Sequence, residues 1–468
     1  MQFSVFSNSE IQGIRKTAFR ILSEIGVRIE HDGMLARLKE QSGVQVEANG
    51  VVRFSQEFVE ACVAQTPKQY TLYGRGGKRT VSFGTGQMNL KTTPGDSKYA
   101  DLETRTLRDA VLNDITEAAD VVDALEHINI AGCMFEPSEL PLDVRYAAAL
   151  AEVIKRTDKP PRIWAPIIPE LTQRVLDVLI AAAGGPDELR AKPMMSHSLE
   201  PISPLRYSTG LDAMIMFAQM GQPIIIGPMV QSLLTGPCTL AGTSALCIAE
   251  GLCGLCLVQI VAPGNPVALA AAAHPCDAKT LSIVYGSPEM ALLAAGTVQV
   301  IKSFNLPAYS NGGYCDAKTP DMQLGIEKAS TMILSAMVGA DSYGHMGSVS
   351  ILGASPLQAI MDDQLVAYMK RIRQGVRVDE EALAFEAIQR VGIGGQFITD
   401  DHTLDNWRDE FWMPNSLFDR SQPEKWCSEG STTMLERAKV LRSEILRTHR
   451  PNLADQKTCD AMQRVLDA

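Results

Sequence analysis

Eight short apolar runs are spread between residues 88 and 347, and each is followed by a segment of helix length that is rich in Ala and Leu. The runs cover residues 88–93, 128–134, 162–167, 193–199, 223–230, 266–274, 307–311 and 341–347. A strand followed by a helix, repeated eight times, is typical of a (β/α)8 TIM barrel. A doubly wound open α/β sheet is the alternative, and the number of units favours closure of the barrel.

The segments on either side of these units read as helical. Apolar residues at Ile11, Ile14, Ala18 and Leu22 have helical spacing, which ends at Gly26. Residues 379–391 and 424–447 have the same character. We therefore expect an α-rich N-terminal cap at 1–86, a barrel core at 87–374, and a C-terminal helical extension packed on the barrel at 375–468.

Composition narrows the class of protein. The chain has 468 residues, is 46% hydrophobic and carries a formal charge of −11, which suits a large globular protein and disfavours a nucleic-acid partner. The longest apolar run, 240–261, contains Glu250 and Gln259, so we interpret it as a buried helix and expect no membrane association. The start shows no signal-peptide pattern, and most cysteines lie in apolar runs, so we expect a reduced, cytoplasmic protein.

In a barrel, the functional side chains lie at the carboxyl ends of the strands. We predict catalytic roles there for Asp316, Glu200 and His345. The expected substrate-binding residues are Phe135, Glu136, Trp164, His197, Gln231, His274, Asn311, Tyr314 and Tyr343. Aromatic rings, carboxylates and neutral polar groups together suit a bound organic cation.

A different chemistry is also encoded near the strand ends. His274, Cys276 and Cys315 could form a zinc site at adjacent strands, and such a zinc would activate a thiol substrate. Pro275, and the lack of a Cys-x-x-Cys pair nearby, weaken this alternative. Cys253 and Cys256 have metal-site spacing but lie inside the apolar run, where core packing explains them. Our main interpretation has no metal in this chain.

Several motifs together resemble the trimethylamine methyltransferase family. They are I-L-S-E-I-G-V ending at Val27, D-L-E-T from Asp101, E-P-I-S-P-L from Glu200, Y-G-S-P-E from Tyr285, G-G-Y-C-D-A-K-x-x-D from Gly312, H-T-L-D-N-W from His402, and D-R-x-x-x-x-x-W from Asp419. The resemblance spans the whole chain. It implies a corrinoid-dependent methyltransferase that moves a methyl group to cob(I)alamin on a separate corrinoid protein, with no cofactor bound tightly in this chain.

One departure from the family affects the expected substrate. The founding members contain pyrrolysine, whereas this chain is written wholly in standard residues. A quaternary ammonium releases a neutral tertiary amine and needs no proton on its leaving group, whereas a tertiary amine must first be activated. We therefore expect a quaternary amine, above all glycine betaine giving dimethylglycine. A tertiary-methylamine methyltransferase and the zinc-dependent thiol methyltransferase are the alternatives.

In this hypothesis the barrel mouth binds a betaine. Rings of Phe135, Trp164, Tyr314 and Tyr343 and the carboxylates of Glu136, Glu200 and Asp316 would surround the ammonium. The carboxylate end would bind His197, Gln231, His274 or His345. A corrinoid protein would dock over the same open face, and we expect the chain to form a homo-oligomer.

Overall fold

A parallel six-stranded sheet is the centre of the computed structural model, which describes residues 3–350 and 353–468. The strand order is β11-β13-β14-β15-β16-β6, and every ladder in it is parallel. These strands are β6 (Asn89–Thr92), β11 (His197–Leu199), β13 (Ile224–Ile226), β14 (Val267–Ala271), β15 (Ala308–Ser310) and β16 (Ser342–Met346). The fold class is therefore α/β, with a parallel sheet of the kind found in TIM-like folds.

The other two predicted strands form a parallel pair of their own. β9 (Ala131–Gly132) pairs with β10 (Pro161–Arg162), and a parallel bridge from Lys91 to Ile130 connects this pair to β6. All eight apolar runs therefore contain a strand. Within residues 3–350 and 353–468, no backbone ladder joins β10 to β11, so the expected full closure is not seen.

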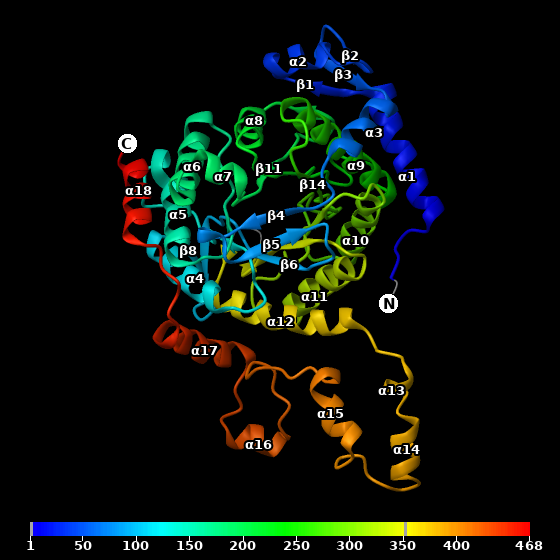
Figure 1. Ribbon diagram of the computed structural model, residues 1–468, viewed down its shortest axis with the longest axis vertical. Helices are drawn as coiled ribbons and strands as arrows, with labels where there is room; N and C mark the ends of the chain where they lie inside the picture. Colours follow the sequence, from blue (N-terminus) through cyan, green and yellow to red (C-terminus); the bar gives the residue numbers. More distant parts are fainter. Residues whose placement is uncertain (1–2, 351–352) are drawn as a thin grey trace.

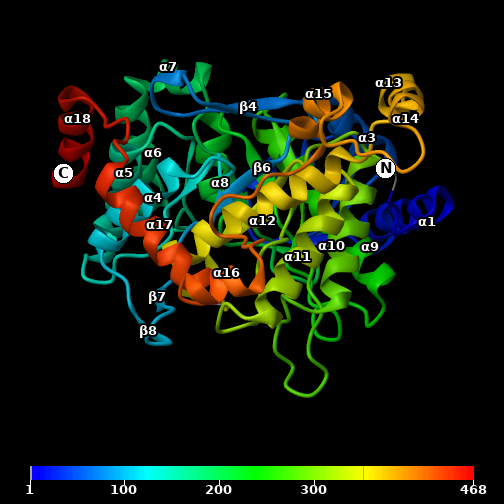
Figure 2. The same cartoon turned by 90° about the horizontal axis from the view of Figure 1, so that it is seen from below.

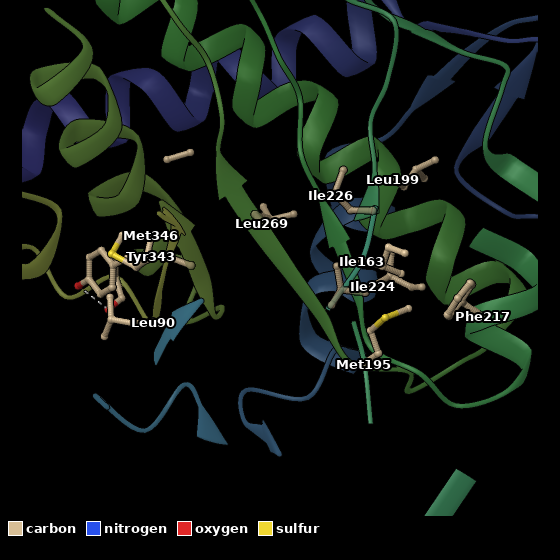
Figure 3. Close-up of a cluster of buried hydrophobic side chains, with 14 of the residues drawn as sticks. Leu90, Ile163, Met195, Leu199, Phe217, Ile224, Ile226, Leu269, Tyr343 and Met346 are labelled. Carbon is tan, nitrogen blue, oxygen red and sulfur yellow. Dashed lines mark hydrogen bonds between the residues drawn. The ribbon is translucent and has the colours of Figure 1, made fainter. Parts of the chain in front are cut away.

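A helix follows each of the eight strands, as the sequence predicts. These helices are α4 (Leu112–Ala124), α5 (Leu142–Arg156), α6 (Pro169–Ala183), α8 (Leu211–Gln219), α9 (Leu240–Val261), α10 (Pro288–Lys302), α11 (Met322–Met337) and α12 (Pro356–Gln374). Figure 1 shows them as a ring around the strands. Buried aliphatic side chains such as Leu199, Ile224 and Leu269, together with Phe217 of α8, fill the space between sheet and helices (Figure 3).

Helix α9 is long and apolar enough to cross a membrane by length and composition, but 89% of its most apolar window is buried inside the fold. It packs against α1 (Asn8–Arg20), α3 (Gln56–Gln65), α10 and β14. Its buried Glu250 accepts hydrogen bonds from Ser203 Oγ and Leu205 N, both at 2.7 Å, and so fixes the loop after β11. The prediction of a buried core helix is confirmed.

The N-terminal segment contains strands as well as the expected helices. α1 lies where the sequence predicts a helix, and α2 (Asp32–Lys39) and α3 also lie in the segment expected to be rich in helix. Between and beyond them run β1 (Val27–Ile29), β2 (Val44–Val46), β3 (Val51–Phe54), β4 (Tyr70–Tyr73) and β5 (Thr80–Phe83). The first three join β12 (Arg206–Tyr207) in a four-stranded sheet. These strands have only three or four residues each, too few for a clear alternation of apolar and polar positions.

The β4–β5 hairpin covers the amino ends of the central strands. Tyr73 N donates to the carbonyl of Pro193, just before β11, and Gly84 N donates to Asp341, just before β16. The ring of Phe83 stacks on Tyr70 at 4.5 Å and on Tyr309 of β15 at 5.4 Å. Figure 2 shows β4 on one side of the ring and the hairpin of β7 (Lys98–Asp101) and β8 (Thr106–Asp109) on the other. Access to the sheet interior is thus from the carboxyl ends.

The C-terminal extension is packed on the helix ring only in part. α17 (Met434–Thr448) contacts α4 and α12, and α18 (Gln456–Asp467) contacts α5 and α6. In contrast, α13 (Glu380–Leu383), α14 (Phe385–Val391) and α15 (Asp401–Glu410) project away from the ring (Figure 1). We call residues 376–410 the arm. The remaining helix, α16 (Pro423–Ser428), follows it.

A buried ion pair connects the last two helices of the ring to the end of β16. Lys328 of α11 donates to Asp362 of α12 at 2.6 Å, and both side chains are almost fully buried. The same carboxylate accepts hydrogen bonds from Gly347 N at 2.7 Å and Gln358 Nε2 at 2.8 Å. The Lys328 ammonium is thus paired with a carboxylate, and the Asp362 carboxylate accepts hydrogen bonds from three donors.

Replacing one partner of this pair should destabilise the fold strongly. Asp362→Ala leaves the Lys328 ammonium buried without a counter-charge, so we expect a loss of about 3–5 kcal/mol in the free energy of unfolding. Urea denaturation measures it. Glu24→Ala, which removes the exposed pair with Arg20, is the control and should change stability far less, because water screens exposed charges. Equal effects of the two substitutions would contradict this account.

Candidate active site

A cavity opens at the carboxyl ends of the parallel strands. Small or apolar residues such as Gly227 and Ala270 form part of its wall. The polar and aromatic side chains that line it are Lys91, Arg162, Trp164, Ser198, Glu200, Tyr309, Ser310, Asn311, Tyr314 and His345. Five of the residues predicted from the sequence are among them, namely Trp164, Glu200, Asn311, Tyr314 and His345.

The lining forms two layers along the strands. Side chains two residues apart point to the same face of a strand, and two residues span about 6.5 Å. Arg162 and Trp164 are such a pair, as are Ser198 and Glu200. Because the strands run toward the mouth, we call the level of Lys91, Arg162 and Ser198 the deep layer. The level of Trp164, Glu200, Asn311 and Tyr314 is the outer layer.

Aromatic rings wall one side of the cavity. Tyr314 stacks on His345 with ring centroids 3.4 Å apart, and Tyr285 lies 4.7 Å from Tyr314. The ring of Trp164 lies 6.4 Å from that of His345. Burial holds the pKa of His345 well below its ordinary value and raises the pKa of Tyr314 well above its ordinary value. All these rings are therefore uncharged at neutral pH.

The backbone of β16 turns His345 into the cavity. Tyr343 and His345 would share a face in a regular strand, but the pairing with β6 shifts between Tyr343 and Met346. His345 itself has a φ of +68°, a left-handed conformation that costs free energy for a residue with a side chain. The shift leaves Tyr343 buried away from the cavity, where its hydroxyl donates to the carbonyl of Ala340. Such bulges are common next to active sites.

Two cations lie in the deep layer, and sequence reasoning missed both. The exposed fractions of Lys91 and Arg162 are only 5% and 4%. Arg162 donates to the carbonyl of Ser196 and to Ser198 Oγ, but its Nε has no hydrogen-bond partner among the residues that the structure describes. Among residues 3–350 and 353–468, Lys91 has neither a hydrogen bond nor an ion pair. The sequence feature that could have identified them is a charged residue within an apolar run, as for Lys91, or at its first position, as for Arg162.

Burial sets the protonation of the charged groups. It lowers the pKa of Lys91 to about 7, and the nearby Arg162 charge acts in the same direction. Glu200 is open to the cavity, yet the surrounding protein raises the pKa of its carboxyl group. Asp96, just beyond β6, has its pKa raised to about 7 by burial. The cavity thus combines a positive deep layer with a carboxyl group in the outer layer.

Three predicted residues lie behind the cavity wall. Phe135 is fully buried and stacks on Tyr99 at 5.3 Å, and Glu136 lines a separate small space beside Trp164. His274 is buried with its Nε2 3.1 Å from the Asn311 side-chain nitrogen. Burial lowers the pKa of His274 to about 3, so the neutral ring orients Asn311 through this contact.

Four other predicted residues also lie outside the cavity lining. His197 points to the opposite face of β11 and stacks on Phe217 at 4.5 Å, because Ser198 and Glu200 occupy the inner face. Tyr343 is directed outward by the β16 shift. Asp316 accepts hydrogen bonds from Tyr285 N at 3.0 Å and Gly286 N at 2.8 Å, so it fixes the loop that carries Tyr285. Gln231 contacts Cys276, with 3.8 Å between Oε1 and Sγ.

The residues of the zinc alternative are not gathered. Cys276 contacts Gln231, whereas Cys315 is fully buried with its Sγ 3.7 Å from the carbonyl of Ser348. Throughout the described part of the chain, no three His, Cys, Asp or Glu side chains lie close enough together to hold a metal ion.

A pocket at the carboxyl ends of parallel strands, lined by rings and titratable groups, defines the class as an α/β enzyme with a small-molecule site. The sequence matches the trimethylamine methyltransferase (MTTB) family over residues 1–467, and the chain belongs to that family. It is therefore a methyltransferase.

Several relatives align over nearly the whole chain. Glycine betaine methyltransferase of Desulfitobacterium hafniense strain Y51 is 30% identical, covering 97% of this chain and 94% of the relative. Trimethylamine methyltransferase MttB of D. hafniense strain DCB-2 is 27% identical, covering 99% and 93%. MttB of Methanosarcina thermophila is 29% identical, covering 99% and 97%. These relatives act on methylated amines, as their names state.

Removing the buried charge of Lys91 should stabilise the free enzyme. The pKa of Lys91 is about 7 in the fold against an ordinary value of 10.5, so below pH 7 its burial costs free energy in full. Between pH 7 and about 10 the unfolded chain holds more protons, so wild-type stability rises with pH. We expect Lys91→Met to be more stable by at least about 1 kcal/mol at pH 7, with a smaller gap at pH 9. Urea unfolding at both pH values measures this, and a less stable Lys91→Met at pH 7 would refute it.

Proposed function

We propose that this enzyme transfers a methyl group from a quaternary amine to cob(I)alamin carried by a separate corrinoid protein, and that glycine betaine, which gives dimethylglycine, is its principal substrate. The observation that carries the proposal is the outer layer of the cavity. There the rings of Trp164 and Tyr314 and the carboxyl group of Glu200 line one small space. Each ring contact with a cation contributes about 0.5–2 kcal/mol, so several together give useful affinity.

The cavity residues bind and orient the substrate. With the ammonium held by Trp164, Tyr314 and Glu200, one N-methyl group faces the mouth, and exclusion of water strengthens the contacts inside. The methyl acceptor supplies the nucleophile. The C–N electron pair stays on nitrogen, so a neutral tertiary amine leaves and no protein group has to donate a proton. The ring of His345 is neutral, which is consistent with a reaction that needs no proton donor from the protein.

The rim of the mouth suits a protein partner. Exposed apolar side chains follow several different strands there, including Ile167, Leu233, Leu281 and Met322. Exposed apolar residues grouped around a site are typical of docking surfaces. They support docking of the corrinoid protein directly over the cavity. We also propose that the strands form a closed (β/α)8 barrel. Arg162 on β10 donates a hydrogen bond to the carbonyl of Ser196 beside β11, and this contact supports closure between the two strands.

We also propose a cellular location and a second candidate substrate. All ten cysteines are free thiols, which supports a reduced, cytoplasmic setting. The trimethylamine methyltransferases among the relatives keep a tertiary amine as the second candidate substrate.

An anaerobic spectrum tests the reaction. The enzyme is mixed with cob(I)alamin, free or on a candidate carrier protein, and glycine betaine is added. We expect loss of the Co(I) band and growth of methyl-Co(III), and Ala in place of Tyr314 should slow the conversion by tenfold or more. Conversion with trimethylamine and not with any quaternary amine would refute the substrate assignment. No conversion with either would refute the corrinoid reaction.

The arm is our candidate for the contact that forms a homo-oligomer. Its exposed apolar side chains are Val376, Val378, Leu383, Phe385, Ile388, Ile393, Phe397, Ile398 and Leu404. α13–α15 lie on the same side of the ring as β4, opposite the mouth (Figure 2). A corrinoid protein over the mouth would therefore leave the arm uncovered, and a second copy of this chain is the partner that could bury it.

Charges on the arm should dissociate the oligomer. We expect Phe385→Asp combined with Ile393→Asp to lower the mass measured by light scattering after gel filtration to that of a single chain. The control is Met322→Asp at the mouth, which should leave the mass unchanged. An unchanged mass for the arm variant would place the contact elsewhere, and a wild-type monomer would refute the oligomer.

A further inference from the structure

The deep layer of the cavity holds positive charge that the protein does not neutralise. Other deeply buried lysines are satisfied. Lys159 Nζ donates to three backbone carbonyls at 2.6–2.7 Å, and Lys328 is paired with Asp362. Lys91 has no such partner among the described residues, and no carboxylate lies within ion-pair distance of Arg162 there. A buried charge without a partner is costly, so it calls for an anion from outside the chain.

The cavity gives that anion a place beside both cations. Lys91 and Arg162 both line it, and within the described part of the chain the Nε of Arg162 has no hydrogen-bond acceptor. Arg162 is held by Ser196 and Ser198, and its guanidinium lies 5.5 Å from the ring centroid of Trp164. Gly344 leaves room for the Lys91 ammonium, because a side-chain carbon at position 344 would collide with Nζ.

The sign of the charge reverses between the two layers. The deep layer is positive, whereas the outer layer presents Glu200 and aromatic ring faces. The Arg162 guanidinium of the deep layer lies 5.5 Å from the centroid of the Trp164 ring in the outer layer, so the two levels are close enough for one small zwitterion to contact both. A ligand with a carboxylate at one end and a methylated ammonium at the other would match both levels at once.

We propose that Lys91 and Arg162 bind the carboxylate of the substrate, so that this enzyme selects N-methylated zwitterions over methylamines and amino alcohols that lack a carboxylate. This assignment replaces the earlier expectation that His197, Gln231, His274 or His345 fills the role. His197 faces away from the cavity. The rings of His274 and His345, which lie beside the cavity, are uncharged. The proposal rests on the proposed function only for the identity of the methyl donor.

The anchor also determines which end of the substrate reacts. With its carboxylate in the deep layer, a betaine must place its ammonium in the outer layer and a methyl group toward the mouth. Choline would leave both cations unpaired, and trimethylamine would leave the deep layer without a ligand. The free-energy cost of these unpaired charges is the physical basis of the discrimination.

Calorimetry without any corrinoid tests the anchor with three matched ligands. Glycine betaine has both charges, choline lacks the carboxylate, and 3,3-dimethylbutanoate has the carboxylate but a neutral tert-butyl group. We expect wild-type enzyme to bind glycine betaine at least tenfold more tightly than choline. Lys91→Met should weaken glycine betaine and 3,3-dimethylbutanoate at least tenfold and leave choline unchanged or tighter. Lys279→Met, which removes an exposed lysine near the mouth, is the control and should change nothing.

Two further measurements separate an anchor from a structural role. Gly344→Ala keeps the lysine but displaces its ammonium, so it too should weaken binding of both carboxylates. Glycine betaine affinity should fall from pH 7 to pH 9 in wild type, as Lys91 loses its proton, and should fall less in Lys91→Met. The other charged groups facing Lys91 are Arg162, Asp96 and Glu200. Because burial raises the pKa of Asp96 to about 7 as well, and the Lys91 ammonium acts to lower it, Asp96→Asn measured over the same pH range isolates the contribution of Lys91.

The outcomes distinguish this inference from the proposed reaction. Wild-type affinity for glycine betaine in Lys91→Met, or equal affinities of wild type for choline and glycine betaine, would overturn the anchor. Methyl transfer from glycine betaine at the wild-type kcat/KM in Lys91→Met would do the same and leave the reaction standing. Lys91-dependent binding of carboxylates with no methyl transfer would support the anchor and refute the reaction.

Discussion

The site depends on one constraint, which is that all the central strands run in the same direction. Their carboxyl ends therefore open at one edge, and side chains from β6, β10, β11, β15 and β16 meet there. The opposite edge is covered by the β4–β5 hairpin, whose Phe83 stacks on Tyr309 inside the sheet. Tyr309 also lines the cavity. The hairpin thus covers the amino end, and the cavity opens toward the carboxyl ends of the strands.

The cavity is maintained against the preferences of the polypeptide. His345 has a left-handed backbone, and Lys91 is buried with no hydrogen bond or ion pair to any residue in the described part of the chain. Both features cost stability, and both direct a polar group into the same space. The nearby Lys328–Asp362 pair shows how the chain treats a buried charge when stability alone matters, since it surrounds that carboxylate with three donors. The contrast between Lys91 and Lys328 indicates that the deep layer is organised for a ligand.

Sequence patterns could predict the strands, the helices that follow them and part of the site. Trp164, Glu200, Asn311, Tyr314 and His345 were accessible because they lie at or close to the carboxyl ends of the strands. The direction of a side chain is harder, because a shift of one residue reverses the face. That is why His197 and Tyr343 were expected in the cavity and are not there. Lys91 and Arg162 lie within the strands, so a search limited to residues at the strand ends does not find them. Asp316 accepts hydrogen bonds from two backbone amides, and no local sequence pattern predicts these contacts.

The two layers also bear on how one family can serve different amines. Relatives named for glycine betaine and for trimethylamine are about equally similar to this chain, so whole-chain identity does not separate the substrates. Rings and a carboxyl group in an outer layer would suit any methylated ammonium. A carboxylate on the substrate can be sensed only where positive charge lies at the right depth. In this chain the groups at that depth are Lys91 and Arg162, so substrate choice follows from two residues inside the strands and not from the strand-end residues that face the methyl group.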